Sequence, residues 1–231
     1  MGVPARLIAK LLLQTAMASL VYAALLFGAA GSFDWPSAWA YLAVFTSANL
    51  AAGIWLARVD PDLLEERLKP PIQTGQKVWD RFFFLAVGAV FLVWVVLQGL
   101  DARRFGWSHC ALWAQVLGAL MTVLSFIGIG WVYRTNSFAA AVIKMQPERR
   151  QVVVSKGPYA YIRHPMYAFG FFILVGMPLA LGSLWGLAGL PVLAGLFHLR
   201  TLGEEQMLRR ELNGYEDYAR RVPWRYAPGL W

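Results

Sequence analysis

The segment GPYAYIRHPMY, residues 157–167, places an arginine and a histidine directly before a proline. Pro165 suits the first turn of a helix, because a missing N–H costs nothing there. Arg163 and His164 would then lie at the N-terminus of that helix, where free N–H groups and the positive end of the helix dipole favour an anion. The alternative is an interfacial anchor, with the tyrosines at a membrane surface and the arginine extended toward water. The residues alone leave both interpretations open.

A second segment, RTLGEE, carries Arg200 and Glu204 four positions apart, with Glu205 next to Glu204. On a helix, Arg200 and Glu204 share a face, and an ordinary surface ion pair would explain the spacing. These charges, however, directly follow the apolar run LPVLAGLFHL, and ionisable groups at the end of a membrane helix are candidates for function. The planar donors of Arg200 suit bidentate binding of an anion. This pair is therefore a candidate for chemistry.

The elements that must position these segments are apolar. Of the 231 residues, 58% are hydrophobic and 15% are charged. Four stretches without a charged residue are about as long as the roughly 20 residues that a bilayer requires: Leu11–Phe33, Trp35–Ala57, Phe82–Leu100 and Ala111–Tyr133. A fifth apolar region, Met166–Leu199, is too long for one crossing and short for two. The sequence predicts an all-α polytopic membrane protein with about six transmembrane helices, the last two forming a short helical hairpin.

The distribution of charge predicts the topology. Of the 21 Lys and Arg residues, only Arg103 and Arg104 fall in loops on one side of these spans. Basic loops stay in the cytosol, so we expect both termini to be cytosolic. The number of crossings is then even, and the fifth region must turn back, near the Gly and Ser residues of Leu181–Gly186. We expect its second arm to continue past Leu199 as a helix that leaves the membrane. The net charge of +8 sets topology and does not indicate a nucleic-acid partner.

Several function classes are excluded by what the sequence lacks. A single cysteine, Cys110, allows no internal disulfide and no cysteine-based metal site. His109 and His198 have no second ligand at a useful spacing, so no metal is expected. No GxGxxG follows a strand, which excludes a Rossmann domain. The first apolar stretch exceeds the about 7–15 residues of a signal sequence and is expected to be a retained helix. PDLLEERLKPP is expected to form an amphipathic helix ended by prolines.

One membrane domain is expected to cover residues 1–231. Its first part, 1–135, would hold four transmembrane helices, and 136–231 would hold the functional segments. The loops on the outer side, DWPS and DARRFGWSH, offer little beyond tryptophan anchors. The closing segment, ELNGYEDYARRVPWRYAPGLW, is expected to fold back and pack on the cytosolic face.

The combination of SKGPYAYIRHPMYAFG, a hydrophobic hairpin of about 30 residues, RTLGEEQML and GYEDYARRVP resembles the isoprenylcysteine carboxyl methyltransferase family. The resemblance runs from Lys144 to the C-terminus, and PDLLEERLKPP…GQKVWDRFF is similar to bacterial members. It implies an integral-membrane enzyme, in a bacterial inner membrane, that uses S-adenosyl-L-methionine. Membrane sterol reductases end in a similar Arg-His-Pro segment.

The resemblance also implies which residues form the site. Arg200 and Glu204 would be catalytic, with Arg200 orienting the substrate. The residues that would bind the cofactor are Gln151, Val152, Val153, Val154, Tyr159, His164, Pro165, Met166, Tyr167 and Glu204. Gln151 stands where the eukaryotic enzymes carry histidine, and Lys144 where they carry glutamine.

The expected reaction is transfer of a methyl group to a carboxylate, isoprenylcysteine-like, or to a thiol of a lipophilic or small acidic substrate. Membrane lipids are the other expected partners. Transfer between an anion and a sulfonium cancels charge, so a site poor in water favours it. Three alternatives remain: methylation of a phospholipid amine, an NADPH-dependent reductase of the sterol-reductase type, and a transporter or sensor. The last would need polar groups at mid-membrane depth, where only Gln14, Asn49 and Gln115 qualify.

Overall fold

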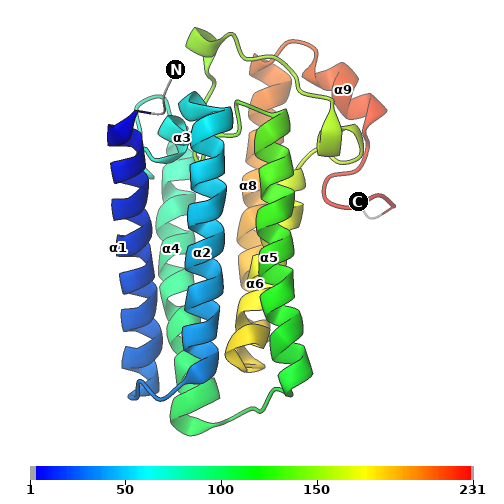
Figure 1. The fold of residues 1–231 in the computed structure, drawn as a ribbon. Helices are drawn as coiled ribbons and strands as arrows, with labels where there is room; N and C mark the ends of the chain where they lie inside the picture. Colours follow the sequence, from blue (N-terminus) through cyan, green and yellow to red (C-terminus); the bar gives the residue numbers. More distant parts are fainter. Residues whose placement is uncertain (1–3, 230–231) are drawn as a thin grey trace.

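The computed structural model describes residues 4–229, and every regular element in that range is a helix (Figure 1). This confirms the predicted all-α class. The helices are α1 (Ala5–Ala30), α2 (Pro36–Val59), α3 (Pro61–Arg67), α4 (Val78–Gly99) with its π-helical continuation η1 (Leu100–Phe105), α5 (Leu112–Thr135), the 3-10 turns η2 (Pro147–Arg149) and η3 (Gly157–Ala160), α6 (Pro165–Leu181), α7 (Trp185–Ala188), α8 (Leu190–Glu211) and α9 (Tyr215–Arg221).

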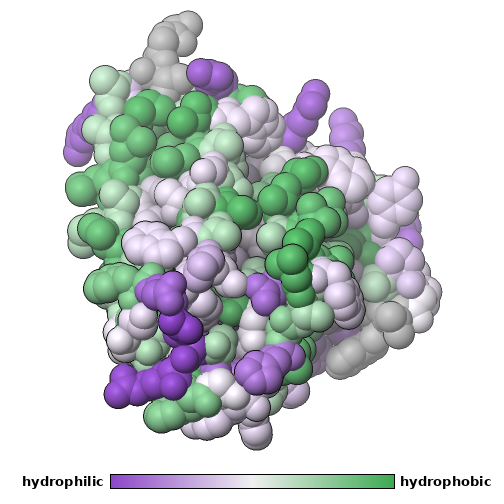
Figure 2. All heavy atoms as spheres, turned by 60° about the horizontal axis from the view of Figure 1, so that its bottom comes forward, coloured by the Kyte–Doolittle hydropathy of each residue, from purple (hydrophilic) through white to green (hydrophobic). Residues whose placement is uncertain are grey.

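Five helical stretches are long and apolar enough to cross a membrane: Ala5–Ala30, Pro36–Val59, Val78–Phe105, Leu112–Thr135 and Trp185–Glu211. The shorter apolar helix α6 completes the six predicted segments. Figure 2, which brings the lower end of Figure 1 forward, shows hydrophobic residues over the flanks and hydrophilic ones toward both ends. Large apolar side chains such as Leu20, Val93 and Leu124 are exposed on these flanks. A surface of this kind is stable in lipid, so the chain is a polytopic membrane protein.

The predicted hairpin is present. Helix α6 begins at Pro165, turns at Gly182 in the left-handed conformation, and α8 continues past Leu199 to Glu211. Helices α5 and α6 approach closely because glycines face each other. A Cβ atom at Gly118 would lie only 2.4 Å from the backbone nitrogen of Ala180.

The loop that starts with Asp101 does more than the sequence indicated. Asp101 is fully buried, and its Oδ2 accepts hydrogen bonds from Ser183 Oγ (2.6 Å) and Ser108 Oγ (2.7 Å). The backbone N–H of Trp185 also donates to it, at 3.1 Å. Asp101 therefore holds the turn between α6 and α8. The sequence pointed only to tryptophan anchors here, because a carboxylate at a span's end is ordinarily solvated.

The opposite end, which we call the basic end, carries α3, the segment 136–164 and α9 above the helices, and α1 also begins there (Figure 1). The predicted return of the last segment is confirmed: Tyr215 and Tyr218 of α9 are buried against Tyr159 and Leu208. Beyond α9, the carbonyl of Trp224 accepts a hydrogen bond from the N–H of Arg163, at 2.9 Å. The last segment thus closes over the start of α6.

Candidate active site

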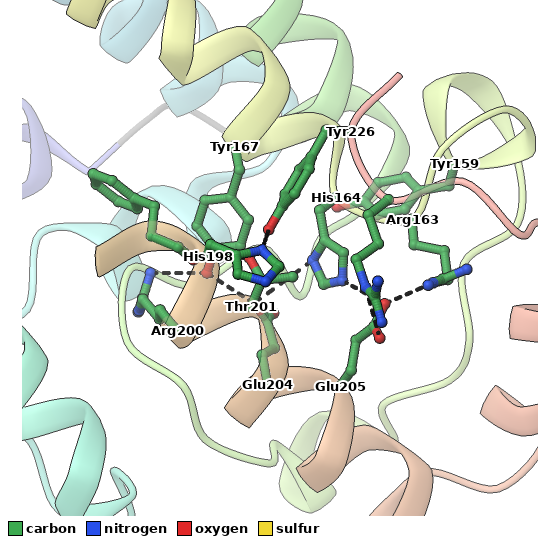
Figure 3. Close-up of polar contacts among 12 residues, drawn as sticks. Tyr159, Arg163, His164, Tyr167, His198, Arg200, Thr201, Glu204, Glu205 and Tyr226 are labelled. Carbon is green, nitrogen blue, oxygen red and sulfur yellow. Dashed lines mark hydrogen bonds and ion pairs between the residues drawn. The ribbon is translucent and has the colours of Figure 1, made fainter. Parts of the chain in front are cut away.

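Helices α6 and α8 bring the two motif segments together at the basic end (Figure 3). The hydroxyl of Tyr167 donates to Glu204 Oε2 at 2.8 Å, and Arg200 Nη1 donates to the same hydroxyl at 3.0 Å. The arms of a tight helical hairpin must lie side by side, so residues 37 positions apart in sequence become neighbours. The structure therefore joins the Arg-His-Pro and Arg-Glu segments in one site.

The sequence suggested that Arg200 would hold an anion, but the guanidinium already has partners within the protein. Its Nε donates to Asp80 Oδ1 at 2.8 Å, and Nη2 donates to the carbonyl of Ala141 at 2.8 Å. Only 8% of the Arg200 side chain and none of Asp80 is exposed. The guanidinium is therefore already neutralised, and its role is to connect α4, α6 and α8.

Asp80 is the residue that the sequence reading missed. Its Oδ2 accepts hydrogen bonds from Gln76 Nε2 and from the backbone N–H of Ile143, each at 2.9 Å. A buried carboxylate is stable only when paired and fully hydrogen-bonded, and both oxygens meet that condition. The available signal was an acidic residue at the start of a predicted span, since intramembrane charges normally have a nearby partner.

The N-terminus of α6 holds a carboxylate of the protein itself. Glu205 Oε1 accepts from Arg163 Nε at 2.6 Å and lies 3.2 Å from His164 Nε2, and Oε2 lies 3.2 Å from Arg225 Nε. The anion site expected at this helix end is therefore occupied by Glu205. Arg163 is buried in this cluster and does not extend to water. Because Glu205 and Glu204 are adjacent on the helix, their side chains diverge into two environments.

Glu204 is the more accessible of the two, with 27% of its side chain exposed. Among the described residues, its one cationic neighbour within 4 Å is the His164 ring, at 3.8 Å, which is charged only when protonated. Its hydrogen bond from Tyr167 fixes one oxygen. Glu204 therefore presents a carboxylate without a permanent cation, so it is suited to a positively charged ligand.

These side chains border a cavity of about 120 Å³. Nine of the ten residues expected at the cofactor line it, as do Arg200 and Lys144; the nine are Gln151, Val152, Val153, Val154, Tyr159, His164, Met166, Tyr167 and Glu204. Pro165 is buried at the first turn of α6 and does not border the cavity. The fixed φ of proline makes it part of the helix start instead.

Lys144 supplies a positive charge at the cavity wall. Its Nζ lies 2.5 Å from Glu66 Oε1 and donates to Gln73 Oε1 at 3.1 Å. Burial raises the pKa of the Glu66 carboxyl, but hydrogen bonds from Lys144 and Lys69 outweigh this and hold the pKa below its usual value. Helix α3 thus positions a cavity residue through Glu66.

Aromatic rings and amides complete the wall. Tyr159 accepts a hydrogen bond from Asn136 Nδ2 at 2.9 Å, and its carbonyl accepts one from Tyr218 Oη at 2.9 Å. Burial raises the pKa of Tyr159, Tyr215 and Tyr218, so these phenols remain neutral. Gln151 Oε1 accepts from the N–H of the buried Gln146, which orders the segment before the cavity.

Within residues 4–229, no group of three or more His, Cys, Asp and Glu side chains is arranged to hold a metal ion. The site is therefore a cavity with an accessible carboxylate, a neutralised arginine, phenols and an apolar wall. The partly exposed Glu204 carboxylate is the feature of this cavity that suits a positively charged ligand.

Two comparisons bear on this site. Residues 113–213 match a family model described as phospholipid methyltransferase, a range that runs from α5 through α8. A nickel-cobalt-cadmium resistance protein, NccN, from Alcaligenes xylosoxydans xylosoxydans is 27% identical over 135 residues, which are 57% of this chain and 59% of that protein. The alignment thus spans about three fifths of that relative. The part of the chain that contains α6 and α8 is therefore similar to membrane methyltransferases, without specific support for the isoprenylcysteine branch.

Proposed function

We propose that this protein is an integral-membrane methyltransferase that uses S-adenosyl-L-methionine and methylates a lipophilic acceptor at the basic end. The observation that carries the proposal is the contact of Tyr167 with Glu204 at one cavity, since it joins the two motifs of the family resemblance. The match of residues 113–213 to phospholipid methyltransferases supports the same activity.

The residues present fit this cofactor. When bound, it supplies a methyl group on a positively charged sulfur. Glu204 offers the charge that such a cation, or the ammonium of the same molecule, prefers, and tyrosine rings add cation–π attraction. Val152, Val153 and Val154 would cover a flat purine, while Gln151, Tyr159, His164, Met166 and Tyr167 would enclose the rest. Pro165 would act indirectly, by fixing the start of α6.

The contacts of Tyr167 explain how the site is kept rigid. Its hydroxyl receives a hydrogen bond from Arg200 and gives one to Glu204, so the carboxylate has one preferred orientation. Arg200 is in turn fixed by Asp80. Positioning of this kind contributes a large part of the rate when two reactants must meet in line. Arg200 would thus be a positioning residue and not a direct holder of the acceptor.

This changes the expected acceptor. A carboxylate acceptor needs a cation, but the Arg200 fork is engaged with Asp80 and the Ala141 carbonyl, and Lys144 at the cavity wall is paired with Glu66. The accessible charge of Glu204 instead attracts an ammonium, and Glu204 can take the proton that an ammonium must lose before its nitrogen offers a lone pair. The phospholipid methyltransferase match points the same way. We therefore propose the amine headgroup of a lipid as the acceptor, ahead of the carboxylate or thiol that the sequence favoured.

The first test is calorimetric titration of the detergent-purified protein with S-adenosylhomocysteine. We expect saturable binding that Glu204→Gln weakens and that Glu65→Gln, an exposed carboxylate on α3, leaves unchanged. A folded protein that does not bind, or whose melting temperature rises with NADPH instead, would refute the proposal in favour of the reductase.

The second test identifies the acceptor. The protein is incubated with methyl-labelled S-adenosyl-L-methionine and one acceptor at a time. The three acceptors are phosphatidylethanolamine, a farnesylcysteine analogue and an alkyl thiol. We expect label in the amine lipid. Label in the carboxylate analogue alone would keep the methyltransferase and overturn the assignment of the acceptor.

A further inference from the structure

A second concavity lies on the lateral surface of the bundle, between α2 and α5, with a volume of about 490 Å³. We call it the lateral groove. Small side chains of α2, Ala48, Ala51 and Ala52, leave the space open, and Trp55 and Trp131 stand toward its basic end. None of its lining residues lines the cavity at Glu204. The groove is therefore a separate feature, which the proposed methyl transfer does not use.

The groove is about as long as one leaflet is thick. Along α5 it extends over the twelve residues from Val123 to Arg134, or about 17 Å at 1.5 Å per residue. The hydrocarbon core of a bilayer is about 30 Å thick, so the groove covers about half of it. Because α5 ends at Thr135 on the basic end, that half belongs to the leaflet on this side. A lipid chain from that leaflet runs parallel to the groove.

The chemistry of the lining changes at one end. All the lining side chains are apolar except Arg134, which is exposed in the last turn of α5. In the part of the chain from Pro4 to Gly229, Arg134 makes no hydrogen bond or ion pair, whereas Arg67, Arg163 and Arg200 of the same end are paired. An arginine at the membrane surface attracts lipid phosphates, and the two tryptophans mark the same level.

We propose that the lateral groove binds one acyl chain of a phospholipid from the leaflet on the basic side, with the lipid phosphate at Arg134. The lateral groove is apolar along the length of one leaflet and ends at the unpaired Arg134. A phospholipid matches this pattern, because its acyl chain is apolar along one leaflet and its phosphate is anionic. The alanines leave room for the chain, because a larger side chain at any of the three positions would narrow the groove. The proposal does not rest on the proposed methyltransferase activity.

The test uses the full chain reconstituted in phosphatidylcholine vesicles that contain phosphatidylglycerol with a photoactivatable acyl chain. After illumination, mass spectrometry locates the cross-links. We expect them to concentrate on α2 and α5 along the groove. Cross-links spread evenly over all lipid-facing helices would overturn the proposal, and this readout requires no variant.

Two variants sharpen the test. Ala51→Trp should abolish the groove cross-links, and Ala18→Trp, at an exposed alanine of α1, should retain them. Arg134→Gln should lower the preference for phosphatidylglycerol over phosphatidylcholine by about fivefold, the effect of one arginine near a charged lipid. Arg6→Gln, an exposed arginine in the first turn of α1 at the same end, is the matched control and should not change it. An equal loss in Arg6→Gln would show attraction by general surface charge and contradict a specific site. S-adenosylhomocysteine binding, measured in parallel, reports separately on the proposed function.

Discussion

The ion pair between Asp80 and Arg200 provides the sharpest test of the site. Asp80→Asn keeps the shape of the side chain and removes its charge, which leaves the Arg200 guanidinium buried without a counter-ion. The Asn NH2 group would also meet another donor in either orientation: Gln76 Nε2 and the Ile143 N–H at the Oδ2 position, or Arg200 Nε at the Oδ1 position. Because Arg200 is 92% buried, water cannot replace the lost partner.

The expected loss can be estimated from the burial. Removing one member of a buried ion pair costs about 3–5 kcal/mol of folding free energy, whereas exposed pairs contribute about 0–1 kcal/mol. Asp34→Asn is the matched control, because Asp34 pairs with Arg103 at 2.8 Å with 83% of its side chain exposed. We therefore expect Asp80→Asn to destabilise the protein several times more than the same substitution at Asp34.

The assay is equilibrium unfolding in mixed micelles, followed by tryptophan fluorescence. Arg200→Met and the double variant complete a double-mutant cycle, in which we expect a coupling of about 2 kcal/mol or more between directly contacting groups. Loss of less than about 1 kcal/mol in Asp80→Asn, with no coupling to Arg200, would refute the conclusion that the guanidinium is neutralised by Asp80.

Three further predictions concern other contacts. Tyr167→Phe removes the hydroxyl that links Arg200 to Glu204. It should weaken S-adenosylhomocysteine binding in calorimetry and lower the melting temperature only slightly; unchanged binding would contradict this. Gly118→Ala should cost about 1–3 kcal/mol in unfolding assays, because its Cβ meets the α6 backbone at 2.4 Å, while Gly88→Ala, with nothing within 4 Å, should be neutral or better. The pKa of Glu66 is lowered by its lysines, so its contribution is present above its unfolded pKa and is lost as pH falls through the lower, folded value. Melting temperatures between about pH 6 and pH 3 should therefore fall less steeply in Glu66→Gln than in the wild-type protein, and parallel curves would exclude this role.

The sequence was sufficient for the architecture of the membrane part. Spans without charges are expected to be helices in lipid, because a helix satisfies its own backbone there, and the excess of basic residues in alternate loops predicts an even number of crossings. The hairpin from Pro165 to Glu211 followed from the same arithmetic. The proximity of Tyr167 to Glu204 was predictable as well, since a short hairpin leaves its two ends side by side.

Which charges pair was decided only by the tertiary structure. Arg200 has a carboxylate one turn away on its own helix, yet it pairs with Asp80, which is 120 positions earlier on α4. Likewise, Glu205 occupies the start of α6, and Asp101 holds a turn at the opposite end. Spacing along one helix shows which side chains share a face. Which oppositely charged group is buried beside each of them depends on how the other helices pack. The helices are local in origin and are set by the hydrophobicity of the chain; the electrostatics of the site arise only once they pack.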